Sequence, residues 1–137
     1  MNSDSFQESL NSIARTVHEA VRAWSTAHGQ SDIPNWDDAP EWMRASTYES
    51  VVRVIENAGM SGRELHQFWV EEKMRDGWQY GPTKSSEARA HPLMIPFDEL
   101  PVTERLKDDL VVAIVRALTR QEGDILEPVF RPETIND

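Results

Sequence analysis

The sequence predicts an all-α fold, a compact bundle of about four helices with one long ordered loop. Apolar residues recur at intervals of three and four in four segments, no segment alternates as a strand does, and glycine and proline gather at a few breaks. A chain of 137 residues, 39% of them hydrophobic, has the size of one domain. We describe it as an N-terminal amphipathic helix (1–30), a central helical domain (31–120) and an acidic C-terminal tail (121–137).

The first expected helix spans about residues 5–27 and ends near Gly29. One face of it is apolar at helical spacing, which is typical of a helix that packs on a core. The alternative is a dimerisation helix, because the segment lies at a chain end. The apolar face consists of Phe6, Leu10, Ile13, Val17, Val21 and Trp24.

The second expected helix covers about residues 41–58. Pro34, Pro40 and several Asp and Asn residues predict a loop before it. A broad apolar face runs along the helix, and Gly59 is placed to end it. That face consists of Trp42, Tyr48, Val51, Val52, Val54, Ile55 and Ala58.

A third helix is predicted from an S-x-x-E capping box, formed by Ser61 and Glu64, to about Arg75. Gly77 is expected to end it. Its apolar residues are Leu65, Phe68, Trp69 and Met74.

Residues 77–102 contain four prolines and predict a long loop. Its apolar content favours packing over disorder, and loops of this length in compact domains are often functional. Thr103 is the expected N-cap of the last helix, with Glu104 in its first turn. The core-facing residues of that helix are Leu106, Leu110, Val111, Ile114, Val115 and Leu118, and residues 121–137 are expected to be an extended tail.

Composition excludes several classes of function. The formal net charge is −10, so we expect no binding to duplex nucleic acid, which depends on Lys and Arg neutralising phosphates. The chain has no cysteine, which removes disulfides, thiolate catalysis and Cys-type zinc sites. No segment has the pattern of a signal peptide or a membrane span, so we expect a cytoplasmic protein without membrane contact.

The residues that could support catalysis are few. None of the four histidines pairs in an H-x-x-x-H motif, and neither a nucleophile elbow nor a phosphate-binding loop is present. Glu71 and Glu72 are adjacent and point about 100° apart on a helix, so they do not form an acid and base pair. We therefore expect no enzyme activity, no metal site and no cofactor, and we expect His66 to be a hydrogen-bonded structural histidine.

The candidate site is the GWQYGP loop and the basic residues after it. Two glycines flank Trp78 and Tyr80 and can leave their rings partly uncovered near Lys84, Arg89 and His91. Aromatic faces beside cations suit a planar anionic ligand such as a nucleotide, with the base stacked and the phosphates paired. The alternative is that both rings belong to the core and the cations are solvated surface.

Several motifs in order resemble the RyR domain, the repeat named after ryanodine receptors. A helical H-x-x-W is followed by GW-x-YG, then by HP-x-L-x-P-[YF]-x-x-LP and an acidic-basic pair. The resemblance covers about residues 36–118, with Phe97 in place of the commoner Tyr, Arg105 in place of Lys, and Asp109 where a basic residue is usual. The matching residues are His66, Trp69, Gly77, Trp78, Tyr80, Gly81, His91, Pro92, Met94, Pro96, Phe97, Leu100, Pro101, Glu104 and Arg105.

The resemblance implies a helical, non-enzymatic domain. In the animal receptors the domains form tandem pairs, which hold an adenine nucleotide between the tryptophans of their GW motifs, and prokaryotic members are associated with nucleotide-derived signals. A single-copy chain is similar to the standalone bacterial or phage form. Trp78 matches the GW tryptophan of the family, so by the resemblance it would stack on the base. From the glycine-flanked aromatic loop, which lies in a charge-neutral segment of an acidic chain, we expect Tyr80 to shape the pocket and Lys84, Arg89 and His91 to meet phosphates.

Two hypotheses for function follow. The first is a binder of a nucleotide or an ADP-ribose-like signal, acting as a sensor or as a phage sponge that sequesters the signal. The second is a protein interaction module without a metabolite ligand. Because a single copy lacks a tandem partner, we also expect a homodimer with two-fold symmetry.

Overall fold

The computed structural model describes residues 3–126 and the side chains of residues 5–119. The described chain folds into four α-helices: α1 (Ser3–Ala27), α2 (Glu41–Glu56), α3 (Gly62–Arg75) and α4 (Val102–Leu126). Two short 3-10 helices, η1 (Trp36–Asp38) and η2 (Phe97–Glu99), lie in the connections. The predicted all-α class with four main helices is confirmed.

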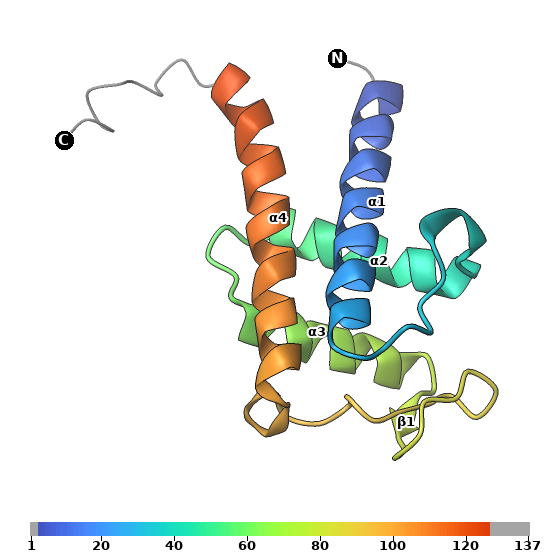
Figure 1. The fold of residues 1–137 in the computed structure, drawn as a ribbon. Coiled ribbons are helices and arrows are strands. Elements are labelled where there is room, and N and C mark those ends of the chain that lie inside the picture. The colour runs from blue at the N-terminus through green and yellow to red at the C-terminus, as the bar shows by residue number, and fades with distance from the viewer. Residues whose placement is uncertain (1–2, 127–137) are drawn as a thin grey trace.

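The two long helices α1 and α4 lie side by side, and α2 and α3 cross them on one side (Figure 1). The first turns of α1 lie at one end of this bundle, and the segment between α3 and α4 lies at the other (Figure 1). In the described residues no helix is both long and apolar enough to cross a membrane.

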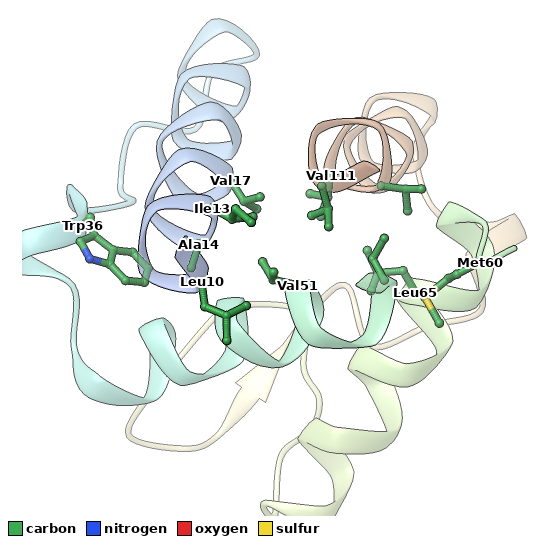
Figure 2. Close-up of a cluster of buried hydrophobic side chains, with 12 residues drawn as sticks. Leu10, Ile13, Ala14, Val17, Trp36, Val51, Met60, Leu65 and Val111 are labelled. Carbon is green, nitrogen blue, oxygen red and sulfur yellow. The ribbon is translucent and has the colours of Figure 1, made fainter. Parts of the chain in front are cut away.

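One hydrophobic core joins all four helices, as Figure 2 shows for its main members. On α1 the buried residues Leu10, Ile13, Ala14 and Val17 follow the three-and-four spacing of a helix face. The core-facing interpretation of this helix is therefore confirmed for its middle, whereas Phe6, in the first turns of the predicted face, is 55% exposed. The other members of the core are Trp36, Val51, Val54, Met60, Leu65, Val111, Val112 and Val115.

α3 begins and ends where the sequence predicts. The Ser61 hydroxyl accepts a hydrogen bond from the Glu64 amide at 3.2 Å, and the Glu64 carboxylate accepts one from the Ser61 amide at 3.0 Å. Gly77 follows the helix with a φ of +87°, a conformation that favours glycine. The end of α2 differs, because the helix stops at Glu56 with Asn57 as its cap, and Gly59 lies beyond it.

The bounds of α4 also differ from the prediction. The helix begins at Val102, where the Pro101 carbonyl accepts hydrogen bonds from the next turn, so Thr103 lies inside the helix instead of capping it. At its other end α4 continues to Leu126, six residues into the segment predicted as an extended tail. Pro128 is the first proline after Pro101, so no proline interrupts the helical segment. The rest of the predicted tail, residues 127–137, lies outside the described residues.

The segment between α3 and α4 is a packed loop, as predicted, with two short strands. β1 (Gln79–Tyr80) and β2 (Ala90–His91) pair in parallel, with Gln79 opposite Ala90. Met94 and Leu100 are buried, and they anchor the later part of the loop on the helices.

Gly62 is the position where α3 and α4 approach most closely among the described glycines. A Cβ there would lie 2.9 Å from the Asp109 backbone nitrogen and would also meet the Asp109 carboxylate. We expect Gly62→Ala to lower the free energy of unfolding by about 1 to 3 kcal/mol, because the overlap with backbone outweighs the better helix propensity of alanine.

Urea unfolding of Gly62→Ala and Gly59→Ala tests this expectation. A Cβ at Gly59 would have no neighbour within 4 Å, so that control should change stability by less than about 1 kcal/mol. Equal effects of the two substitutions would show that the close approach of the helices is not as described.

Candidate functional site

A cavity of about 210 Å³ lies among the four helices. It is lined by the second half of α1, Ile33 in the loop before α2, residues 42–50 of α2, one face of α3, the segment after α3 and the first half of α4. Its walls are largely apolar, with charged and polar groups at intervals. The titratable groups in the lining are His18, His66, Lys73, Lys84, His91, Glu104, Lys107 and Asp108.

Lys73 is the most buried cation of the site, with 5% of its surface exposed. Its ammonium nitrogen lies 4.5 Å from the ring centre of Trp42 and 4.7 Å from that of Trp78. The two indole rings are 5.4 Å apart, with 48° between their planes, so the ammonium contacts a wedge of two rings. No residue in the described part of the chain forms an ion pair with Lys73.

Opposing effects act on the protonation of Lys73. Burial lowers its pKa and nearby Lys84 adds to this, while the carboxylates of Glu72 and Asp76 raise it. The two indole faces attract the charged form as well. A buried charge is normally paired, and neither Glu72 nor Asp76 forms an ion pair with Lys73, so an anion in the cavity would supply a close counter-charge.

The other two lysines of the lining have acidic partners. The Lys107 ammonium lies 2.6 Å from the Glu104 carboxylate, and both side chains are largely buried. The Lys84 ammonium lies 3.7 Å from the carboxylate of Asp32, which is more exposed.

Asp108 is an unusual acid at the α4 side of the cavity. Burial raises its pKa to about 7, and the negative charges of Glu104 and Asp109 act in the same direction, against Lys107. Its carboxylate lies 3.8 Å from Nδ1 of His66, which is too far for a hydrogen bond.

Two histidines of the lining have defined tautomers. The His66 Nε2–H donates to the Ile95 carbonyl at 2.7 Å, which leaves Nδ1 as an acceptor. This hydrogen bond agrees with the structural role expected for His66. In His91 the roles are reversed, because Nδ1 accepts from the Leu93 amide at 3.1 Å and Nε2 carries the proton of the neutral ring. Burial lowers the pKa of His91 to about 4, and Lys84 and Lys73 reinforce the shift. His91 is therefore a neutral hydrogen-bond donor near pH 7.

The structure brings two of the five predicted site residues, Lys84 and His91, into the cavity lining. Trp78 is buried behind Lys73 and is not part of the lining. Its amide donates to the Lys73 carbonyl at 2.9 Å, which holds the ring against α3. In the structure the Trp78 ring contacts the Lys73 ammonium. Ligand stacking on Trp78 stays a prediction.

The other two predicted residues, Tyr80 and Arg89, lie outside the lining. Tyr80 is exposed on β1. Arg89 has a φ of +53°, and its guanidinium donates to the Asp76 carbonyl at the end of α3. Arg89 therefore satisfies a helix C-terminus in this structure.

Sequence reasoning missed Lys73, Trp42, Trp69 and Asp108 as site residues. Along α3, His66, Trp69 and Lys73 follow a spacing of three and four, which puts them on one face. Met74 was assigned to the apolar face instead, but it is 62% exposed. A lysine in register with an aromatic helix face was the signal that could have identified Lys73.

A comparison with protein families gives one match. Residues 49–123 match the model described as RyR domain. These 75 residues are more than half of the 137-residue chain and include α3, the loop after it and most of α4.

In the described residues no group of three or more His, Asp or Glu side chains is placed to hold a metal ion.

The raised pKa of Asp108 predicts a pH-dependent effect of Asp108→Asn. The folded protein holds this proton up to about pH 7, against an ordinary value of 3.8, so the stability that Asp108 contributes is present at low pH and lost as pH rises through 7. We expect Asp108→Asn to stabilise the protein relative to wild type at about pH 8, and much less at about pH 4. The slope of the difference should reach about 1 kcal/mol per pH unit.

Urea unfolding of both proteins across this range measures the difference. The lowered pKa of His91 gives an opposite slope between about pH 4 and its ordinary value of 6.5, but it is common to both proteins and cancels. A difference that does not vary with pH would contradict the burial of the Asp108 charge.

Proposed function

This chain belongs to the RyR domain family, and on that basis we propose that it binds a small anionic ligand of the nucleotide or ADP-ribose class, without catalysis. The ligand occupies the cavity among the four helices. Its anionic group pairs with Lys73, and its planar group lies along the aromatic side of α3. The role is that of a sensor or of a protein that sequesters the signal.

The buried ammonium of Lys73 carries the proposal. Lys84 and Lys107 each have a carboxylate partner within 4 Å, and Lys73 has none among the described residues. It lines the cavity and is held there by the rings of Trp42 and Trp78. In an acidic chain, a buried cation without an ion-pair partner is a favourable place for an anion. Trp78 then serves the ligand by positioning Lys73.

Size limits the ligand. Pockets that enclose drug-sized ligands usually measure about 300 to 1,000 Å³, and this cavity of about 210 Å³ is smaller. It therefore suits a ligand about the size of a nucleoside monophosphate, and the rest of a larger ligand such as ADP-ribose projects from it. A second copy of the chain would cover a projecting portion, which is consistent with the expected homodimer.

Sedimentation measures the oligomeric state. At tens of micromolar protein we expect a dimer, with more of it when nucleotide is present if the second copy covers the ligand. A single species of 15.7 kDa with and without nucleotide would exclude the homodimer.

Substitution of Lys73 by Met tests the binding proposal. Methionine keeps a long apolar stem between the two rings and removes the charge, so the fold should survive. We expect AMP to bind at least about tenfold more weakly, because a desolvated ion pair with the phosphate is lost. Calorimetry on the intact chain measures the affinity.

Arg15→Gln is the matched control for Lys73→Met. Arg15 is an exposed cation paired with Asp37 at 2.8 Å on the surface, so its loss changes the net charge equally and should leave AMP affinity unchanged. Unchanged affinity in Lys73→Met would move the site elsewhere. No binding of AMP or ADP-ribose to the intact chain would favour the interaction module.

A further inference from the structure

We propose that His66 and Asp108 form an acceptor pair that recognises an amino group, so that this chain prefers nucleotides whose base carries an exocyclic amine. The proposal rests on the proposed function, because it concerns the same cavity and ligand class. It assigns base selection to the α4 side of the cavity and anion binding to Lys73.

The first step of the argument is the chemistry of the two acceptors. His66 donates its only proton to the Ile95 carbonyl, so its Nδ1 lone pair is free to accept. Asp108 presents a carboxylate 3.8 Å from that nitrogen, and in the described part of the chain no residue donates a hydrogen bond to either atom. Both side chains line the cavity, with 6% and 19% of their surface exposed. Acceptors that line a largely apolar cavity and have no donor from the protein favour a ligand that brings donors.

The separation of the two acceptors suits an NH₂ group. One nitrogen can lie at a normal hydrogen-bond distance of about 2.9 Å from each of two atoms 3.8 Å apart, with one N–H directed at each. A carbonyl oxygen in the same place would face two lone pairs and would be repelled. An amine is therefore distinguished from a keto group at this position.

The titratable and charged groups around Asp108 come from three helices. From α4, Glu104 and Lys107 neutralise each other, and Asp109 adds a negative charge. From α3 the neutral ring of His66 faces Asp108, and Lys73 lines the same cavity farther along the helix. From α1, His18 lines the same cavity and is hydrogen-bonded to the Pro34 carbonyl. A cationic ligand group would meet the positive field of Lys73 and Lys84, which line the same cavity, and this opposes an ammonium at Asp108.

The second step is the distance between the two ends of the cavity. Lys73 lies seven residues after His66 on α3, which is about 10 Å along the helix, and Trp69 lies between them on the same face. A nucleoside monophosphate has its amine and its phosphate at opposite ends, separated by a planar base and a sugar. The cavity matches this order, because the acceptors His66 and Asp108 lie where the amine would be and the Lys73 ammonium lies where the phosphate would be.

Matched nucleotides test the proposal on the intact chain. AMP and IMP differ by an amine against a keto group, and CMP and UMP differ in the same way. By calorimetry at about pH 8, we expect AMP to bind about fivefold or more tightly than IMP, and CMP than UMP. At about pH 6 Asp108 takes up a proton and can donate to a keto group, so both ratios should fall.

Two variants separate base selection from anion binding. Asp108→Asn should bring both ratios close to one, because the amide can turn either its oxygen or its NH₂ toward the base. Glu8→Gln removes the same charge from an exposed residue of α1 outside the cavity lining, so its ratios should equal those of the wild type. Lys73→Met should weaken all four nucleotides by a similar factor and leave the ratios unchanged.

Each contrary result has a separate meaning. If none of the four nucleotides binds, the proposed function is wrong. If all four bind with equal affinity, the chain binds nucleotides and the assignment of His66 and Asp108 is overturned. If the preference persists in Asp108→Asn, another group reads the base, and this assignment is likewise overturned.

Discussion

The buried ammonium of Lys73 holds together the end of the bundle that contains α3 and the loop after it. Lys73 on α3 contacts Trp42 from α2 and Trp78 from the loop after α3, so one side chain joins three elements. Gly77 makes this possible, because its positive φ turns the chain so that Trp78 returns onto the helix it has just left. The Trp78 amide then bonds the Lys73 carbonyl, and the backbone and the ring hold the same residue.

This arrangement concentrates charge in a cavity whose other groups are largely neutral or paired. His91 stays uncharged because of burial, and Asp108 is kept partly protonated near pH 7 by burial and by neighbouring carboxylates. Lys107 is balanced by Glu104. Although the chain carries a net charge of −10, the interior of the site is therefore polarised, with a cation at one end and hydrogen-bond acceptors at the other. This polarity supports a dipolar ligand such as a nucleotide.

The sequence was sufficient to predict the helices, because their apolar spacing and the Ser61–Glu64 capping box are local signals. It was less informative about the site, which depends on contacts between distant segments. Trp78 was expected to be partly uncovered because glycines flank it, but its burial depends on Trp42, 36 residues earlier in the chain. Lys73 and Met74 differ by one position on α3, and only the tertiary packing decides which of them is buried. Pairing of acceptors from different helices, as in His66 and Asp108, has no signature in a single sequence.

Lysine NMR tests the central claim most directly, because the chain contains only three lysines. In the free protein the ε-CH₂ resonance of Lys73 should be displaced upfield by the two indole rings, far from the resonances of Lys84 and Lys107. When AMP is added, the Lys73 resonance should shift more than those of the other two lysines, because the phosphate pairs with its ammonium. The shift should reach a plateau as the site becomes saturated. A Lys73 resonance at the ordinary position, or one that AMP leaves unchanged while binding is saturated, would contradict the account.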